Sequence, residues 1–263
     1  MNDSILYCGD TELNGAASYL AGLMTVWGWS FDYLPSYLAM TPEFLEKPHS
    51  LLILSDYPAS QFDATCQKLA LNQIEVGCGL LMIGGWESFH GSGGCWEGTP
   101  LGLALPVEIQ SCDDRMNFDQ SAWLSLTMKH PITMDLPWSA RPPAIGGMNR
   151  VVAKPEASVL LNAHAFKVST DESVGGVQTE TTGWSFRSPE LYPALVVGQF
   201  GSGRTAAFLS DIAPHWVGGF IDWGLPRVTG GGTSGPVIEV GSYYAQFWKQ
   251  LLKWTGRREE IAR

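Results

Sequence analysis

A glycine pair followed by polar and aromatic side chains is the segment of the chain best suited to chemistry. An unbroken apolar run, residues 80–83, ends at Gly84-Gly85. Such a pair permits left-handed backbone conformations and a close approach of a ligand to the main chain. Its backbone N–H groups can face an anionic or carbonyl oxygen. We therefore expect a ligand-binding site here, formed by Gly84, Gly85, Trp86, Glu87, Ser88, Phe89, His215 and Trp216.

Side chains in and near this turn could also supply catalytic groups. Ser88 with His90 and either Asp211 or His215 could compose a hydrolase triad. A serine outside a G-x-S-x-G elbow is more often only a hydrogen-bonding group. Cys95 could act as a displaced nucleophile, or it could be a packed and inert thiol. The candidate catalytic residues are therefore Glu87, Ser88, Asp211, His215 and Cys95.

Two histidines next to prolines raise the question of a metal. His130 precedes a proline and His215 follows one, and either could combine with Asp211 or Glu87. Their spacings match no common zinc signature such as H-E-x-x-H. We therefore expect no metal and no cofactor, and we expect His130 to belong to a rigid, hydrogen-bonded loop.

The charge balance limits the partners of the protein. The 263 residues carry a formal net charge of −10, and no cluster of Lys and Arg occurs before Arg257-Arg258. Nucleic-acid backbones and anionic membrane surfaces require such clusters. We therefore expect a small-molecule ligand, without nucleic acid or membrane as a partner.

The five cysteines indicate a reducing compartment. Their number is odd, none forms a C-x-x-C pair, and no leader-like segment follows Met1. Free thiols of this kind are typical of the cytosol. No apolar stretch approaches 18 residues, the length that would suggest a membrane span. Cytoplasmic residence is therefore the expectation.

Apolar strands and amphipathic helices alternate through the first 90 residues. Strands are predicted at residues 5–8, 31–34, 51–55 and 80–83, and helices at 14–27 and 64–75, the second with Asp63 as its N-cap. Short connections in a βαβαβ order imply a parallel sheet with helices on both faces. The prediction is a three-layer α/β sandwich, one domain over residues 1–263, with a central, largely parallel sheet.

The second half of the chain has a different pattern. Segments 150–153, 158–163, 195–200 and 205–210 are predicted strands, and residues 201–204 are the turn of a hairpin. We expect a further strand at 101–110, irregular structure at 113–125, a patternless loop at 226–236 and a closing helix at 242–255. Many tryptophans and the glycine-rich segment 230–235 suggest self-association.

These motifs, taken in order, resemble the class I glutamine amidotransferase-like superfamily, and in particular its divergent members, which include the trehalose-utilisation-like proteins. The resemblance covers nearly the whole chain and implies a flavodoxin-like fold. The segments that carry it are strand 5–9, strand 51–56, Met82 to Phe89, His130-Pro131-Ile132-Thr133 with Leu136-Pro137, and Phe208-Leu209-Ser210-Asp211 through Pro214-His215-Trp216.

The chain departs from the superfamily at the nucleophile. Active members carry a cysteine on the turn after the central strand, and a histidine shortly followed by an acid completes their triad. The matching position here is Gly84 or Gly85, and the late strand leads into Asp211, with His215 four residues later. We therefore expect a binding or regulatory protein that does not hydrolyse glutamine. The alternative is a hydrolase or amidotransferase-like enzyme that uses Glu87, Ser88, His215 or a displaced Cys95.

Overall fold

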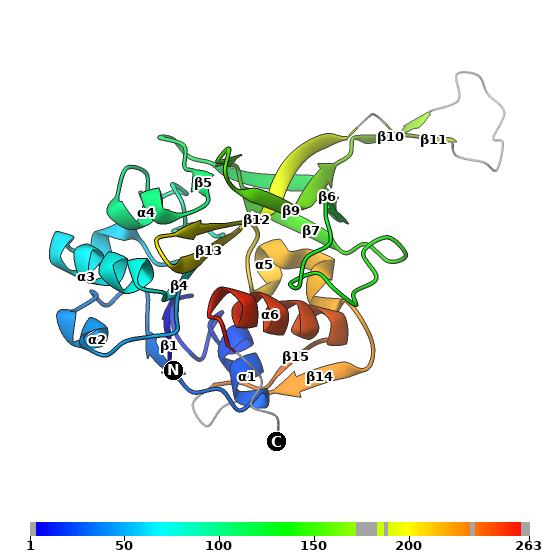
Figure 1. The fold of residues 1–263 in the computed structure, drawn as a ribbon. Helices are drawn as coiled ribbons and strands as arrows, with labels where there is room; N and C mark the ends of the chain where they lie inside the picture. Colours follow the sequence, from blue (N-terminus) through cyan, green and yellow to red (C-terminus); the bar gives the residue numbers. More distant parts are fainter. Residues whose placement is uncertain (1–3, 172–182, 187–188, 232–234, 259–263) are drawn as a thin grey trace.

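A nine-stranded mixed sheet runs through both halves of the chain in the computed structural model, which describes residues 4–171, 183–186, 189–231 and 235–258 (Figure 1). Five strands are parallel neighbours. In spatial order they are β2 (Phe31–Leu34), β1 (Ile5–Gly9), β3 (Leu51–Ser55), β4 (Gly79–Ile83) and β13 (Gly203–Phe208). The predicted α/β sandwich with a largely parallel central sheet is confirmed, and β4, the strand that ends at the glycine pair, lies in the interior of the sheet.

The central parallel strands β1, β3 and β4 are largely apolar because helices cover both faces of this half of the sheet. Every residue of β1, β3 and β4 is buried. Figure 1 shows α2 (Pro42–Glu46) and α3 (Ala64–Glu75) on one side, with α1 (Ser18–Val26) and α6 (Ser242–Thr255) on the other. Continuous apolar runs are what two covered faces require.

Local helix signals predicted α3 and α6 correctly. The Asp63 carboxylate accepts the N–H of Cys66 at 2.7 Å, so it caps α3 as expected. Helix α1 begins at Ser18, later than the predicted residue 14, because the preceding residues form turns anchored on the Asp10 carbonyl, which accepts the N–H groups of Glu12 and Ala17.

Four antiparallel strands extend the sheet beyond β13. Their order is β12 (Glu190–Phe200), β9 (Ser158–Ala165), β6 (Arg115–Leu126) and β7 (Ala144–Asn149). The predicted hairpin between β12 and β13 is confirmed. The prediction of irregular structure at 113–125 was wrong, because β6 alternates between more exposed and more buried residues and therefore lacks a continuous apolar run.

Residues 101–110 were also assigned incorrectly. Pro100–Ala104 is a short helix, α4, whose N-cap Thr99 accepts the N–H of Gly102 at 3.0 Å. A proline at the first helical position after a threonine cap is a helix-start signal that outweighs the apolar composition. Only Val107–Glu108 forms a strand, β5, which pairs with β8 (Val152–Ala153).

The segment predicted as a patternless loop contains a hairpin strand. β14 (Arg227–Gly230) pairs with β15 (Ile238–Gly241), and residues 232–234 lie outside the described part of the chain. Gly230 lets this hairpin lie against α1, since a Cβ there would be 2.7 Å from a Val26 methyl. The remaining elements are β10 (Val168–Asp171), β11 (Gly183–Phe186), α5 (Pro214–Val217), η1 (Ala59–Gln61) and η2 (Gly218–Asp222).

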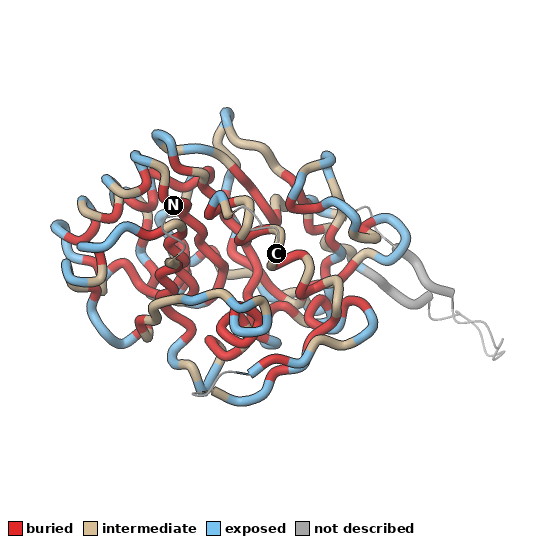
Figure 2. The backbone as a smooth tube through the Cα atoms, turned by 60° about the horizontal axis from the view of Figure 1, so that its bottom comes forward, coloured by how far each residue is buried: buried red, intermediate tan, exposed pale blue. Residues whose placement is uncertain are grey.

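Aromatic side chains fill the core between β13 and α6. Phe208 of β13 packs against Phe247 and Trp248 of α6, and Trp138 and Trp223 extend the cluster. Buried positions run through the interior of the chain trace, whereas exposed positions lie mainly on connections (Figure 2). Most tryptophans of the second half therefore stabilise the core, which removes them as a reason to expect self-association.

Candidate functional site at the carboxyl edge of the parallel strands

The carboxyl ends of four parallel strands meet at one level of the sheet. Gly9 pairs with Ser55, Ser55 pairs with Ile83, and Ile83 pairs with Phe208. The residues that follow these strands therefore share one edge, where open α/β sheets bind their ligands. They include Asp10 after β1, Asp56 after β3, the glycine pair after β4, and Asp211 after β13.

Three aspartates at this edge have carboxyl groups close enough to affect one another's ionisation. Burial, followed by the charges of Asp211 and Asp56, holds the pKa of Asp10 well above its ordinary value. Burial and then the charge of Asp211 raise the pKa of Asp56 to about 7. Burial raises the pKa of Asp211 to about 6. Carboxyl groups that titrate near neutrality can exchange protons at physiological pH.

Hydrogen bonds from neighbouring groups hold Asp10 and Asp211 in place. Asp10 accepts the Tyr7 and Ser55 hydroxyl groups, the latter at 3.0 Å. Asp211 Oδ1 accepts the N–H groups of Ile212 and Ala213 at 2.6 and 3.1 Å. Sequence reasoning named Asp211 but missed Asp10 and Asp56, although each directly follows a buried apolar strand.

The Asp56 carboxylate fills the space that a side chain at Gly85 would take. A Cβ built on Gly85 would lie 2.0 Å from Asp56 Oδ1. The same carboxylate accepts a hydrogen bond from the backbone N–H of Glu87 at 2.8 Å. It also accepts one from the backbone N–H of Trp86. The N–H groups of Trp86 and Glu87, which a bound anion could use, are therefore engaged by the protein itself. Asp56 reaches this position from a left-handed conformation, with φ of 46°.

Gly84 is constrained by the neighbouring strand. Its N–H donates to the carbonyl groups of Phe208 and Ser210 at 2.8 and 3.0 Å. A Cβ at this position would lie 2.1 Å from the carbonyl oxygen of Leu209. At both glycines, backbone or carboxylate atoms therefore fill the space that a side chain would take.

Three of the predicted ligand-binding residues have no exposed side chain. Ser88 is 1% exposed, and its hydroxyl accepts the N–H of Asp56 at 2.9 Å, so it joins the turns after β3 and β4. Phe89 is fully buried, and Trp216 donates its indole N–H to Asn117 at 2.7 Å. These three side chains pack beneath the surface of the site, and they would have to move to contact a ligand.

The exposed face of the site is formed by Trp86, Glu87 and His215. The rings of Trp86 and His215 are 6.2 Å apart in an edge-on arrangement, so the turns after β4 and β13 converge as predicted. The Arg115 guanidinium lies 4.5 Å over the Trp86 ring and also pairs with Asp113. Arg115 was missed because it lies at the start of β6, a strand that the sequence did not indicate.

A buried amide joins this edge to the antiparallel half of the sheet. Asn149, the last residue of β7, accepts the N–H of Gly85 at 2.9 Å and donates to its carbonyl at 3.1 Å. It also donates to Asp114 at 2.7 Å. Asp114 in turn accepts the N–H groups of His90 and Gly91. This chain of bonds fixes the geometry of the turn and of the segment after it.

The structure separates the two histidines considered as metal ligands. The His130 ring lies 4.9 Å from that of Trp254, in the last turn of α6, and burial followed by the charge of Arg204 lowers its pKa. Arg204 is at the start of β13, whereas His215 follows the end of that strand. His130 therefore lies at the opposite edge from His215 and Asp211. Its Nδ1 accepts the N–H of Ile132, as expected of a rigid loop.

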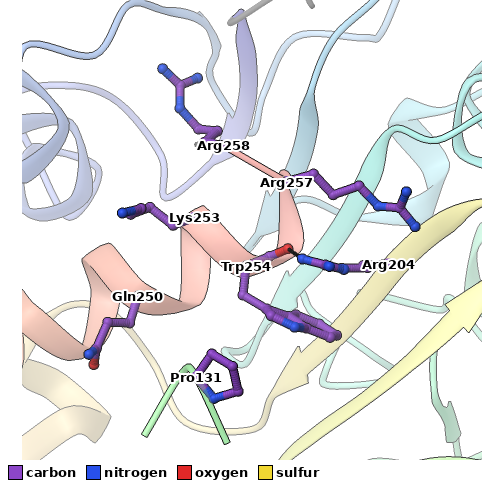
Figure 3. Close-up of a pocket in the computed structure, with 7 residues that line it drawn as sticks. All are labelled: Pro131, Arg204, Gln250, Lys253, Trp254, Arg257 and Arg258. Atoms are coloured by element: carbon purple, nitrogen blue, oxygen red, sulfur yellow. Dashed lines mark hydrogen bonds between the residues drawn. The ribbon is translucent and has the colours of Figure 1, made fainter. Parts of the chain in front are cut away.

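A basic cavity of about 590 Å³ lies at that opposite edge (Figure 3). It is lined by Pro131, Arg204, Gln250, Lys253, Trp254, Arg257 and Arg258. Arg204 donates to the Trp254 carbonyl at 2.7 Å and lies over its ring, and Arg257 donates to Ser202. Cations at the carboxyl end of a helix complement its unpaired carbonyl groups and its dipole. The positive charge therefore has a structural explanation in the end of α6.

Comparison with known families agrees with this architecture. The family model described as "Putative glutamine amidotransferase" matches residues 25–173 and 185–227, which is more than half of the chain. The chain belongs to this family. No curated protein matches it in sequence. As for the membrane, no helix in the described ranges is long and apolar enough to cross one.

Several solved structures have a similar fold. The chain is similar to the cytoplasmic protein STM3548 from Salmonella typhimurium, with 21% identity, a TM-score of 0.69, and coverage of 95% of this chain and 98% of that one. It is also similar to the cytoplasmic protein STM1381 from Salmonella typhimurium LT2, with 23% identity, a TM-score of 0.69, and coverage of 96% of this chain and 99% of that one. A ThuA-like protein from Parabacteroides merdae shares 11% identity with the chain, with a TM-score of 0.60 and coverage of 100% of this chain and 93% of that one. At these identities the likeness concerns the fold.

Proposed function

We propose that this family member binds a small molecule at the carboxyl edge of its parallel strands, in a binding or regulatory role, and does not hydrolyse glutamine. The observation that carries the proposal is the position of the Asp56 carboxylate, which fills the space of an elbow side chain at Gly85. Gly84, the other possible nucleophile position, is closed by the carbonyl oxygen of Leu209.

Glutamine hydrolysis by a thiol requires groups that this edge lacks. A nucleophilic thiolate must lie about 3 Å from a base, and backbone N–H groups must face the developing oxyanion. Here the N–H groups of Trp86 and Glu87 already bond to Asp56. An oxyanion would have to displace a carboxylate that is held within the protein. The fold is therefore retained without the reaction.

The exposed side chains are suited to a small ligand. Trp86 is 47% exposed and lies near both the His215 ring and the Arg115 guanidinium, so it offers an aromatic surface with hydrogen-bond donors beside it. The net charge of −10 supports the absence of nucleic acid and of anionic membranes among the main partners. The free thiols support residence in the cytoplasm.

A metabolite screen by thermal shift tests the binding role. A compound that binds only the folded protein raises its melting temperature. We expect at least one metabolite to raise the melting temperature of the wild type, and we expect Trp86→Ala and His215→Ala to reduce this shift. Val76→Ala is the control, since Val76 is also an exposed apolar residue but comes before β4, at the opposite edge of the sheet. A shift that is equal in Trp86→Ala and Val76→Ala would place the ligand elsewhere.

Ammonia release from glutamine tests the absence of glutaminase activity. We expect none from the wild type, and none from Gly84→Cys alone or combined with Asp211→His. Turnover by the wild type that disappears in Cys95→Ser would refute the proposal and identify Cys95 as a displaced nucleophile.

The second candidate function is that of a hydrolase or amidotransferase-like enzyme, with Cys95 favoured over Glu87, Ser88 and His215. Cys95 is exposed, and ligating atoms of His90 and Glu97 lie within 4.8 Å of its sulfur and of each other. A thiol, an imidazole and a carboxylate are the groups of a cysteine triad. In the described part of the chain, however, no hydrogen bond joins the Cys95 sulfur to the imidazole, as an activated pair would require.

A further inference from the structure

The segment from His90 to Glu97 gathers three different metal-ligating side chains on one short loop. A nitrogen of His90, the sulfur of Cys95 and a carboxylate oxygen of Glu97 all lie within 4.8 Å of one another. The sulfur is on the exposed side of the group, since Cys95 is exposed and the other two residues are partly buried. An imidazole, a thiolate and a carboxylate are all ligands of Zn²⁺.

Two atoms of this group are buried and face each other without a hydrogen bond. His90 Nδ1 and Glu97 Oε2 are 3.0 Å apart, which is within ion-pair distance. The alignment between them does not meet the geometry of a hydrogen bond, and neither atom has another partner. Buried polar atoms of native proteins are nearly always satisfied. A cation between the two atoms would satisfy both.

The spacing is close to that of a tetrahedral zinc site. With Zn–N and Zn–O bonds of about 2.0–2.1 Å and a Zn–S bond of about 2.3 Å, neighbouring ligand atoms lie about 3.3–3.6 Å apart. The nitrogen and oxygen are already near this separation at 3.0 Å. From a separation of up to 4.8 Å, the thiol needs to move inward by about 1.2 Å at most to reach about 3.6 Å, a distance that a rotation of an exposed side chain can supply.

The backbone holds the three ligands in place independently of a metal. The N–H of His90 is bound by Asp114, and the N–H of Cys95 donates to the His90 carbonyl at 3.1 Å. The Trp96 N–H donates to the Phe89 carbonyl at 2.8 Å. Cys95 adopts a left-handed conformation, with φ of 49°, which is a costly arrangement for a residue with a side chain. These features are those of a preorganised site.

We propose that His90, Cys95 and Glu97 bind one Zn²⁺ ion, with the fourth position open to solvent beside Cys95. Binding releases the proton of the Cys95 thiol to solvent, because the thiolate is the ligand. Three protein ligands and an open position are typical of zinc sites that carry out chemistry. The expectation of no metal was based on His130 and His215, and it did not consider these three residues together. The proposal is independent of the ligand proposed for the edge near Trp86.

Metal content and cobalt absorption test the site directly. Metal-free full-length protein is incubated with Zn²⁺ or Co²⁺ and freed of excess metal. We expect about one ion per chain, and with Co²⁺ a sulfur-to-cobalt charge-transfer band. Cys95→Ser should abolish the band and weaken Zn²⁺ binding by more than about 100-fold, the upper end of the loss caused by removing an outer partner of a ligand. His90→Gln and Glu97→Gln should weaken binding as well.

Cys112→Ser is the matched control, since Cys112 is the other exposed cysteine among the described residues. It should retain one ion and the band, and thermal unfolding of each variant without metal verifies that it folds. The proposal is overturned if the wild type retains no Zn²⁺, or if Cys95→Ser binds it as tightly as Cys112→Ser does. A hyper-reactive Cys95 in a protein that binds no Zn²⁺ would overturn it in favour of the thiol enzyme.

Discussion

Asp56 has two effects at the scale of a single residue. It accepts hydrogen bonds from backbone N–H groups of the turn after β4, and its carboxyl group is buried where the ionised form is disfavoured. Its pKa is raised to about 7 by burial and by Asp211. An aspartate in the unfolded chain has a pKa of about 3.9. Between these values the folded protein retains a proton that the unfolded chain releases, so the free energy of unfolding falls as the pH rises.

Asp56→Asn should remove this dependence. Relative to the wild type, the variant should gain roughly 2–4 kcal/mol in free energy of unfolding between pH 4 and pH 8, since one pKa unit corresponds to about 1.4 kcal/mol. Urea unfolding at several pH values measures it. Asp119→Asn, which changes an exposed carboxylate on β6, should follow the wild-type curve. Parallel curves for Asp56→Asn and the wild type would contradict the prediction.

Gly84 shows how a single missing side chain can be required by packing. A Cβ at this position would lie 2.1 Å from a carbonyl oxygen of the backbone, which cannot move as a side chain can. Gly84→Cys and Gly84→Ala should each lower the free energy of unfolding by about 3 kcal/mol or more, at the upper end of the range for overpacking.

Gly93→Ala is the control for this prediction, because a Cβ there meets no atom within 4 Å. It should change the free energy of unfolding by less than about 0.5 kcal/mol, as surface substitutions usually do. Denaturant unfolding measures all three variants. A Gly84→Ala protein as stable as Gly93→Ala would show that the two strands are further apart than described here.

At the scale of elements, Asn149 connects the parallel and antiparallel halves of the sheet at the site. It comes from the end of β7, and its amide satisfies both backbone groups of Gly85 and one oxygen of Asp114. Asn149→Ala leaves both backbone groups of Gly85 without partners, at a cost of about 1–3 kcal/mol for each unsatisfied group, and removes one of the donors to Asp114.

We therefore expect Asn149→Ala to lower the free energy of unfolding by about 3 kcal/mol and to increase hydrogen exchange at Gly85, His90 and Gly91. Asn72→Ala, on the exposed face of α3, should leave both measurements unchanged. Normal protection of Gly85 in Asn149→Ala would contradict the role assigned to this amide. Because Asp114 also binds His90, the variant should weaken Zn²⁺ binding too.

At the scale of the whole molecule, self-association remains a prediction with a changed basis. Trp138, Trp216 and Trp223 are core residues, so they offer no surface to a second copy. Trp123 on β6 and Leu191 on β12 are more than half exposed, on the antiparallel extension of the sheet. Exposed apolar side chains of this size favour a closed symmetric dimer.

Light scattering should give twice the 28.7 kDa mass of one chain, and Trp123→Glu should lower the mass toward that of one chain. Trp86→Glu, which changes a tryptophan of similar exposure at the other site, should leave the mass unchanged. The mass of a single chain over a wide range of wild-type concentrations would exclude self-association.

The amino-acid sequence by itself determined the parallel half of the fold and the place of the glycine turn. Runs such as residues 51–54 are apolar at every position, and the cap at Asp63 lies within three residues of the N–H that it binds. Signals of this kind are local and can be read along the chain. A local signal of the same kind, an apolar run followed by two glycines, predicted where β4 ends.

Only the tertiary structure decided what lies at that edge. Asp56 and Gly85, Asn149 and Gly85, and Leu209 and Gly84 are distant in sequence, and they meet through sheet register. β6 was missed because its polar residues face solvent on one side of the sheet, so its pattern resembles that of a loop. His90, Cys95 and Glu97 are close in sequence, but their ligating atoms converge only in the folded chain. Cys95 adopts a left-handed conformation, and Asp114, which directly precedes β6, binds the backbone N–H of His90. Contacts of this kind depend on long-range packing, which no local pattern records.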